Sequence, residues 1–105
     1  MLKDTQIARL RKALSRDKEK LPEFFDALAD KSRYRIFLLL LENKGLCVTD
    51  IAKVLGISVP AASQQFKILE KASVVQRERM GQMTCYCVDT TNPTVKSIIK
   101  LIGEK

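Results

Sequence analysis

The sequence predicts a mainly α-helical domain with a small β-hairpin, a winged helix-turn-helix with the element order α-α-α-α-α-β-β-α. Apolar residues recur every three to four positions along most of the chain, which is the spacing of one helix face. A glycine-containing turn joins two short helical patterns between residues 49 and 71. After residue 74 the apolar period shortens to two, which indicates strands. At 105 residues, the whole chain (1–105) is expected to form a single domain.

A first helix is expected over residues 4–16, where Ile7, Leu10 and Leu14 form a narrow apolar stripe. A stripe this thin is typical of a seam between two helices, which would make it a dimer contact. It can equally pack on the chain's own core, and this segment alone leaves both alternatives open.

Two further helices should carry the core on which the helix-turn-helix rests. The first of them begins at Pro22 and contributes Phe24 and Phe25. The second is expected from Lys31 to Glu42, with most of its apolar residues buried.

Residues 49–71 carry the local signals of a helix-turn-helix. Thr49 precedes the first helix, and its hydroxyl is expected to cap that helix. Gly56 ends the helix, where a residue able to adopt a positive φ is needed. Ser58 is expected to cap the second helix, and Pro60 lies in its first turn, where the missing N–H costs nothing.

The outer side of this second helix carries short or neutral polar side chains and no carboxylate before Glu70. A helix that enters the major groove of DNA needs such side chains, so DNA recognition is predicted over the alternative of an ordinary polar hairpin. Ser63 and Gln64 are expected to contact base edges. Val59 and Ala61 can touch thymine methyl groups. The predicted DNA contacts, wing included, are Ser58, Val59, Pro60, Ala61, Ser63, Gln64, Gln65, Lys67, Arg77, Arg79 and Gln82.

A β-hairpin, or wing, is expected over residues 74–88, with a turn at Met80-Gly81. Arg77 and Arg79 lie two residues apart on its first strand, so both side chains should point to one face. There they are predicted to meet DNA phosphate or a minor groove. Two solvated arginines on an exposed hairpin are the alternative.

Asn92 is expected to cap a last helix over residues 92–104 that starts at Pro93. Its apolar side would be an aggregation liability if exposed, and pairing with the first helix, of the same chain or of a partner, would cover it. We therefore expect 4–16 and 92–104 to be dimerisation helices. The interface is expected to contain Ile7, Leu10, Leu14, Val95, Ile98, Ile99 and Ile102.

Charge and composition narrow the possible function classes. A net charge of +7 fits an anionic partner, nucleic acid first and a membrane surface second. The chain has no histidine, no glycine-rich phosphate loop and no metal-ligand spacing, so no enzyme, cofactor or metal site is expected. The longest apolar run, residues 36–41, is too short to span a bilayer, and no signal pattern is visible. Three cysteines predict no disulfide framework, and a reducing cytoplasm is the expected location.

Six short motifs occur in the chain: Leu28-Ala29-Asp30, Arg33, Arg35-Ile36, Leu46-Cys47-Val48-x-Asp50-Ile51, Ser58-x-Pro60-Ala61-x-Ser63 and Phe66-Lys67-x-Leu69. Taken together, over about residues 21–91, they resemble the ArsR/SmtB family of small dimeric winged-helix repressors. The resemblance implies a homodimer that binds a double-stranded DNA operator and has no membrane partner. Gln65 stands where the family usually has histidine, and Ser73 where it has glycine. A winged-helix module for protein–protein contact, without specific DNA binding, is the alternative function.

The effector of such a regulator stays unknown at this stage. Relatives that sense arsenic, cadmium or lead carry Cys-Val-Cys where this chain has Cys47-Val48-Thr49, and zinc, cobalt and nickel sensors use histidines that this chain lacks. Both familiar metal sites are therefore incomplete.

Thiol-based sensing of an oxidant, a persulfide or a soft metal by Cys47, Cys85 and Cys87 is an alternative version of the same function. Cys85 and Cys87 share one strand face at roughly 7 Å, which is long for an unstrained disulfide between them. Their reactivity would require a lowered thiol pKa, for which Arg77 or Arg79 could provide the positive charge. Simple packing is the competing interpretation for all three cysteines.

Overall fold

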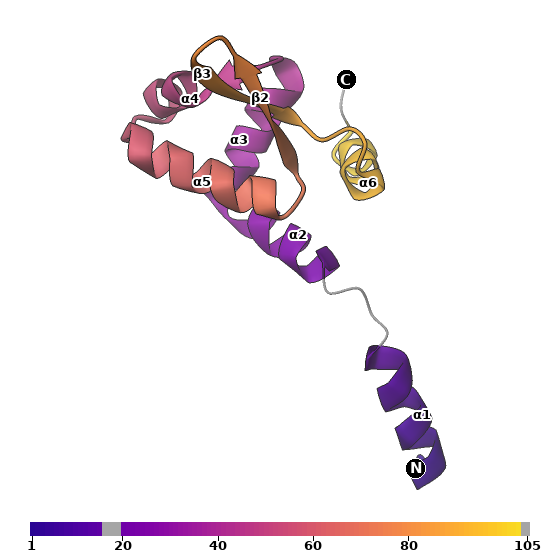
Figure 1. Cartoon of the computed structure of the whole chain (residues 1–105). Coiled ribbons are helices and arrows are strands. Elements are labelled where there is room, and N and C mark those ends of the chain that lie inside the picture. The colour runs from indigo at the N-terminus through magenta and orange to yellow at the C-terminus, as the bar shows by residue number, and fades with distance from the viewer. Residues whose placement is uncertain (16–19, 104–105) are drawn as a thin grey trace.

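The computed structural model describes residues 1–15 and 20–103, and Figure 1 shows the arrangement of its elements. The mainly helical fold with a β-hairpin is confirmed. In chain order the elements are α1 (Asp4–Ser15), α2 (Lys20–Ala29), α3 (Lys31–Glu42), β1 (Leu46–Cys47), α4 (Val48–Leu55), α5 (Val59–Lys71), β2 (Val75–Met80), β3 (Met83–Val88) and α6 (Pro93–Leu101). Within the described ranges, no helix is both long enough and apolar enough to cross a membrane.

The predicted element order omitted one strand. β1 pairs antiparallel with β3, so the sheet has three strands in the order β1-β3-β2, with Leu46 opposite Tyr86 and Cys47 opposite Cys85. A strand of two residues shows no period of its own in the sequence, which is why we missed it. The wing is thus attached through β1 to the chain that leads into α4.

The helix-turn-helix consists of α4 and α5, and three of its four predicted end signals are confirmed. Gly56 adopts φ 69° after α4. The Ser58 Oγ accepts a hydrogen bond from the Ala61 backbone N–H at 3.2 Å, and a proline lies in the first turn of α5. The predicted cap at Thr49 is wrong because α4 already begins at Val48.

The start of α4 is stabilised from inside the helix. The Asp50 carboxylate accepts a hydrogen bond from the Cys47 backbone N–H at 3.2 Å, which is one half of a capping box. The end of α5 is followed by Ser73 at φ 63°, a left-handed conformation that glycine adopts more easily. The Ser73 carbonyl accepts a hydrogen bond from the Asn92 side-chain amide at 2.8 Å, which joins this turn to the start of α6.

The core lies where α2, α3, α4 and α5 meet the sheet. Phe66 of α5 stacks on Tyr86 of β3, with ring centroids 4.3 Å apart and ring planes 7° apart, so the recognition helix packs directly on the wing. The largest fully buried side chains are Phe37, Phe66, Ile36, Ile51, Leu69, Val74, Val75, Val95 and Cys85.

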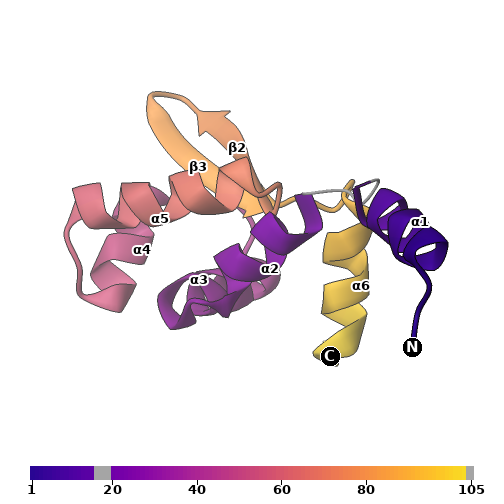
Figure 2. The same ribbon diagram turned by 90° about the horizontal axis from the view of Figure 1, so that it is seen from below.

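The two terminal helices differ from the rest of the fold. α1 contains no buried residue, and in Figure 1 it lies apart from the other helices. In both views α1 and α6 lie on the side of the molecule away from α4 (Figure 1 and Figure 2). The predicted end of the last helix is wrong, because α6 ends at Leu101 and a turn with Gly103 at φ 68° follows. The predicted helix residues 16 and 104 lie outside the described residues.

The expected dimer residues divide into three groups by their exposure. On α1, Leu10 and Leu14 are 51% and 69% exposed, so they have little cover within one chain. On α6, Val95 is fully buried in the chain's own core, so its assignment to a dimer contact is wrong. The remaining α6 residues of the set, Ile98, Ile99 and Ile102, and Ile7 of α1 are partly buried.

Candidate nucleic-acid interface

The outward side of α5 is determined by what its other side buries. Ala62, Phe66 and Leu69 are fully buried against the core. With 3.6 residues per turn, Gln64 and Lys67 lie on the opposite side of the helix, and both are exposed. Packing of the core therefore presents these two side chains to solvent, as the sequence predicts.

The exposed side continues along the whole of α5. Pro60 lies one turn before Gln64, and Lys71 lies one turn after Lys67. All are exposed. Lys71 was absent from the predicted DNA contacts, although its spacing of four residues from Lys67 places it on the same helix face. We call this surface, formed by Pro60, Gln64, Lys67 and Lys71, the α5 outer stripe.

Four other predicted contacts lie at or near the start of α5, beside this stripe. Val59 and Ser63 line a groove on the wing side of the helix. Ala61 is exposed. Ser58 has a structural role, since its Oγ already accepts the hydrogen bond that caps the helix.

Gln65 lies away from the α5 outer stripe and has a partner within the chain, so its DNA contact stays a prediction that this position does not support. Its side-chain oxygen accepts a hydrogen bond from Arg33 Nη1 at 3.0 Å. The same guanidinium donates from Nε to the Ala27 carbonyl at 2.7 Å, at the end of α2. Arg33 thus links the end of α2 to α5 through Gln65. Gln64 and Gln65 have the same side chain, so the sequence alone does not separate their roles. The position of Arg33 in the fold does so.

A groove runs between α5 and the wing, and it collects several of the predicted contacts. Hydroxyl, ammonium and amide groups open into it from Ser63, Lys67 and Gln82. These are groups that donate hydrogen bonds to phosphate oxygens and base edges. The groove is lined by Cys47, Val48, Thr49, Val59, Ser63, Lys67, Arg77, Gln82, Met83, Thr84 and Tyr86.

The two wing arginines share one face of the hairpin, as predicted. Arg77 is paired with Tyr86 and Arg79 with Thr84 across the β2–β3 ladder. Because Tyr86 stacks on α5, this face of the hairpin is the one turned toward the recognition helix. Arg79 is exposed there, beyond Arg77 toward the tip of the wing.

Arg77 already has an anionic partner. Its Nη2 donates to the Glu70 Oε1 at 3.1 Å, so the first acidic residue of α5 ties the recognition helix to the wing. The hydrogen bond to Glu70, followed by one to Tyr86, raises the pKa of Arg77 above its ordinary value. A DNA phosphate at this position would therefore compete with a carboxylate for the guanidinium.

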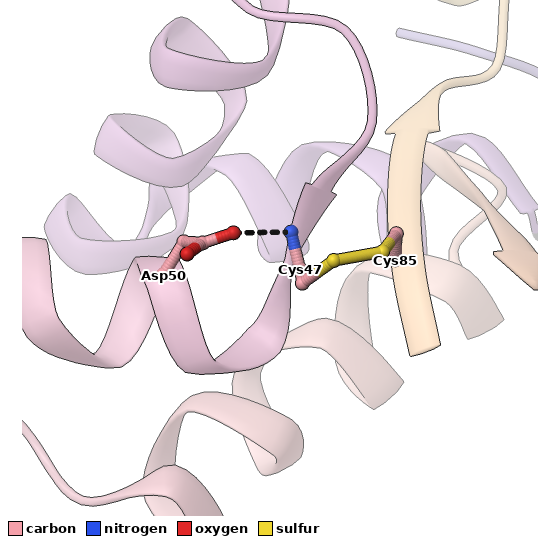
Figure 3. Close-up of a disulfide and its surroundings, with 3 residues drawn as sticks. All are labelled: Cys47, Asp50 and Cys85. Carbon is pink, nitrogen blue, oxygen red and sulfur yellow. Dashed lines mark hydrogen bonds between the residues drawn. A yellow bond between two sulfur atoms is a disulfide. The ribbon is translucent and has the colours of Figure 1, made fainter. Parts of the chain in front are cut away.

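A disulfide joins Cys47 of β1 to Cys85 of β3, and Figure 3 shows it beside the Asp50 cap. The two residues are direct partners in the strand register and are separated by 38 residues in the sequence. The sequence predicts no disulfide framework, and this single bond between Cys47 and Cys85 was not among its expectations. The pairing depended on β1, the strand that the sequence did not reveal.

Cys87 retains a free thiol, so Cys85 and Cys87 do not pair with each other. The Cys87 Sγ donates a hydrogen bond to Glu78 Oε2 at 3.3 Å. Burial, followed by the Glu78 carboxylate, raises the pKa of this thiol. The expectation that Arg77 or Arg79 lowers it is wrong, because the register places both arginines on the opposite face of the hairpin. Across residues 1–15 and 20–103, no group of three or more His, Cys, Asp or Glu side chains could hold a metal ion.

Comparisons with known proteins agree with this geometry. Residues 30–77 match the family of bacterial regulatory proteins described as the arsR family. The chain is 37% identical over 86 residues to the uncharacterized HTH-type transcriptional regulator MJ1325 of Methanocaldococcus jannaschii, with 82% of this chain and 94% of that protein covered. It is 38% identical over 68 residues to the transcriptional repressor SmtB homolog of Synechocystis, with 65% of this chain but 51% of that longer protein covered. The solved structure of the transcriptional repressor PagR of Bacillus anthracis is similar with a TM-score of 0.68 and 30% identity, covering 81% of this chain and 94% of PagR.

Proposed function

Because this chain belongs to the ArsR family of bacterial regulatory proteins, a family of DNA-binding transcriptional regulators rather than enzymes, we propose that it is a homodimeric repressor that reads its operator through α5. The observation that carries the proposal is the α5 outer stripe. It is exposed, it has no acidic member, and it ends in two lysines. In a major groove, Gln64 would contact base edges while Lys67 and Lys71 contact phosphates.

The wing supplements the recognition helix in this proposal. Arg79 lies on the side of the hairpin turned toward α5, and Ser63 of α5 and Gln82 of the wing turn line the groove between the two elements, so one DNA duplex can meet both. Arg79 at the wing would reach phosphate or the minor groove beside the major-groove contact. Arg77 would exchange its pairing with Glu70 for pairing with a phosphate.

The terminal helices support the homodimer. Leu10 and Leu14 of α1, and Leu101 of α6 at 79% exposure, are apolar side chains with little cover in one chain. A second copy that covers them would present two α5 helices about 34 Å apart, which is one turn of the duplex. Two protomers would then bind a near-palindromic operator. We place this regulator in the cytoplasm because its proposed partner is the cell's DNA.

The test compares two glutamines on opposite faces of the DNA-binding unit. The Gln64→Ala variant should lose about 1–3 kcal/mol of binding free energy on DNA from upstream of its own gene, and little on random DNA of equal length. The matched control is Gln76→Ala, because Gln76 lies on the other face of the wing and hydrogen-bonds to Asp89. Fluorescence anisotropy at fixed salt concentration gives both affinities. Equal losses on both DNAs would contradict a base-reading role for Gln64.

A further inference from the structure

The Cys47–Cys85 disulfide connects the two parts of the proposed DNA-binding surface. Cys47 immediately precedes α4, the first helix of the helix-turn-helix, and Cys85 lies within the returning strand of the wing. The chain between the two cysteines contains α4, α5 and β2. The sulfur–sulfur bond therefore closes a loop that includes the whole helix-turn-helix and half of the wing (Figure 3).

The two cysteines differ in their exposure. Cys85 is fully buried, whereas 9% of Cys47 is exposed. The strand register directs both side chains to the face of the wing opposite Arg77 and Tyr86, so the disulfide lies behind the groove between α5 and the wing. A thiolate that attacks a disulfide must reach one of its sulfur atoms, and Cys47 is the less deeply buried residue of this pair.

Disulfides are uncommon in a compartment where DNA is kept, because cellular thiols reduce them. Where such bonds occur, they are mostly transient and serve catalysis or redox sensing, although proteins of hyperthermophiles also use them for stability. The free thiol of Cys87 is hydrogen-bonded to Glu78 on the wing and is not part of the bond. The disulfide thus joins one fully buried and one slightly exposed cysteine at the junction between β1 and the wing.

We propose that Cys47 and Cys85 form a reversible dithiol–disulfide site that controls operator binding, and this proposal rests on the function proposed above. In the reducing direction, the thiolate of a small thiol attacks the Cys47 sulfur, forms a mixed disulfide and releases the Cys85 thiolate, which takes up a proton. A second small thiol attacks the sulfur of the bound small molecule, and Cys47 leaves and is protonated. Two small thiols are thereby oxidised to one small disulfide, and the protein gains two electrons and two protons. Oxidation by a low-molecular-weight disulfide is the reverse of these steps.

The oxidised form is the one expected to bind DNA more tightly. With the bond intact, the wing is tied covalently to the start of α4, in addition to its packing on α5 through the Tyr86–Phe66 stack. Reduction leaves only the two-residue strand β1 to join the start of α4 to β3, and DNA must then order this junction at a cost in affinity. The two equilibria are thermodynamically linked. If the disulfide raises the affinity for operator DNA by some factor, operator DNA must shift the equilibrium toward the disulfide by the same factor.

The experiment uses the full chain in glutathione buffers that range from reduced to oxidised. A thiol-specific polymer label gives the fraction of disulfide on a gel, and fluorescence anisotropy gives the affinity for operator and random DNA. Reduction should weaken operator binding by about tenfold or more, within the usual range of coupling between sites, and reoxidation should restore it. Operator DNA should also shift the equilibrium between dithiol and disulfide toward the disulfide, because binding and oxidation are linked.

Variants separate the three cysteines. Cys87→Ser should keep the full response to the buffer, whereas Cys47→Ser and Cys85→Ser should each show the reduced-state affinity in every buffer. Thermal melting shows whether each variant folds. If a cysteine variant fails to fold, the reversible redox response of the unsubstituted chain remains the test.

Two results would overturn the inference alone. One is a bond that stays intact in fully reduced glutathione, which would make it a structural disulfide. The other is equal discrimination between operator and random DNA in both redox states. A chain that fails to discriminate between the two DNAs in either state would instead overturn the proposed function.

Discussion

α5 and α1 are both amphipathic helices, but their apolar sides have different surroundings. On α5, Phe66 and Leu69 are fully buried by the same chain. On α1, Leu10 and Leu14 repeat at similar spacing, yet each remains at least half exposed. The helix-turn-helix and wing thus bury their apolar residues within one chain, whereas the apolar side of α1 has little cover there, and in our proposal a second copy supplies it. Variants in the two regions should therefore fail in different ways.

The largest effect is expected from Phe66→Ala in the complete unit. Phe66 is fully buried and stacks on Tyr86, so its removal leaves a cavity between α5 and the wing. The free energy of unfolding should fall by about 3–5 kcal/mol, measured by urea denaturation. Phe25→Ala is the control, because Phe25 is 51% exposed and should cost far less. Similar losses for both would show that the α5–wing contact is not part of the core.

A substitution on α1 should act on assembly rather than on the fold of a protomer. Leu14 is 69% exposed in one chain, so Leu14→Asp should leave protomer folding intact while placing a charge in the dimer seam. Sedimentation should show monomers, and operator affinity should fall about 100-fold or more because the second half-site is no longer linked. Thr5→Asp makes the same charge change on the opposite side of α1 and should leave the dimer intact. Dimers that persist in Leu14→Asp would place the contact elsewhere.

A smaller effect, in the stabilising direction, is expected at the junction between α5 and the wing. Ser73 adopts φ 63°, which costs about 1–2 kcal/mol for a residue with a Cβ atom. Ser73→Gly removes this cost but gains unfolded-state entropy, so the net stabilisation should be about 0.5–1 kcal/mol by urea denaturation. Ser73→Ala keeps the Cβ atom and should show no gain. A less stable glycine variant would indicate that the serine side chain contributes more than the backbone costs.

The smallest effect is expected from one charge on the α5 outer stripe. Lys67→Ala should lower the slope of log affinity against log salt concentration by about one, with similar losses on operator and random DNA. Lys96→Ala removes an equally exposed charge on α6 and should leave the slope unchanged. A loss confined to the operator would assign Lys67 to base edges instead of phosphate.

The sequence predicts best what depends on local signals. Ser58 and Asn92 both cap the helices that they precede, and Gly56 ends α4, because each interaction involves residues only a few positions apart. Contacts between distant segments were not predictable in this way. The Cys47–Cys85 bond depends on a two-residue strand, and the role of Gln65 depends on Arg33, which lies 32 residues away in the sequence.

At the candidate site, the sequence predicts which helix faces are apolar but not what covers them. Helical periodicity identifies the side of α5 that carries Gln64 and Lys67, since the buried residues determine the exposed ones. It also places Val95 in an apolar stripe, but it does not say whether the chain's own core or a partner covers that side chain. The structure assigns Val95 to the core of the same chain.

The central claim is that two copies present their α5 outer stripes on one side of the dimer, one duplex turn apart. Its most direct test is the affinity for an operator in which about five base pairs, half a helical turn, are inserted between the half-sites. The insertion rotates the second half-site to the far side of the duplex. We expect operator affinity to fall by about 100-fold or more, to the level of a single half-site. Unchanged affinity for the lengthened operator would contradict the claim.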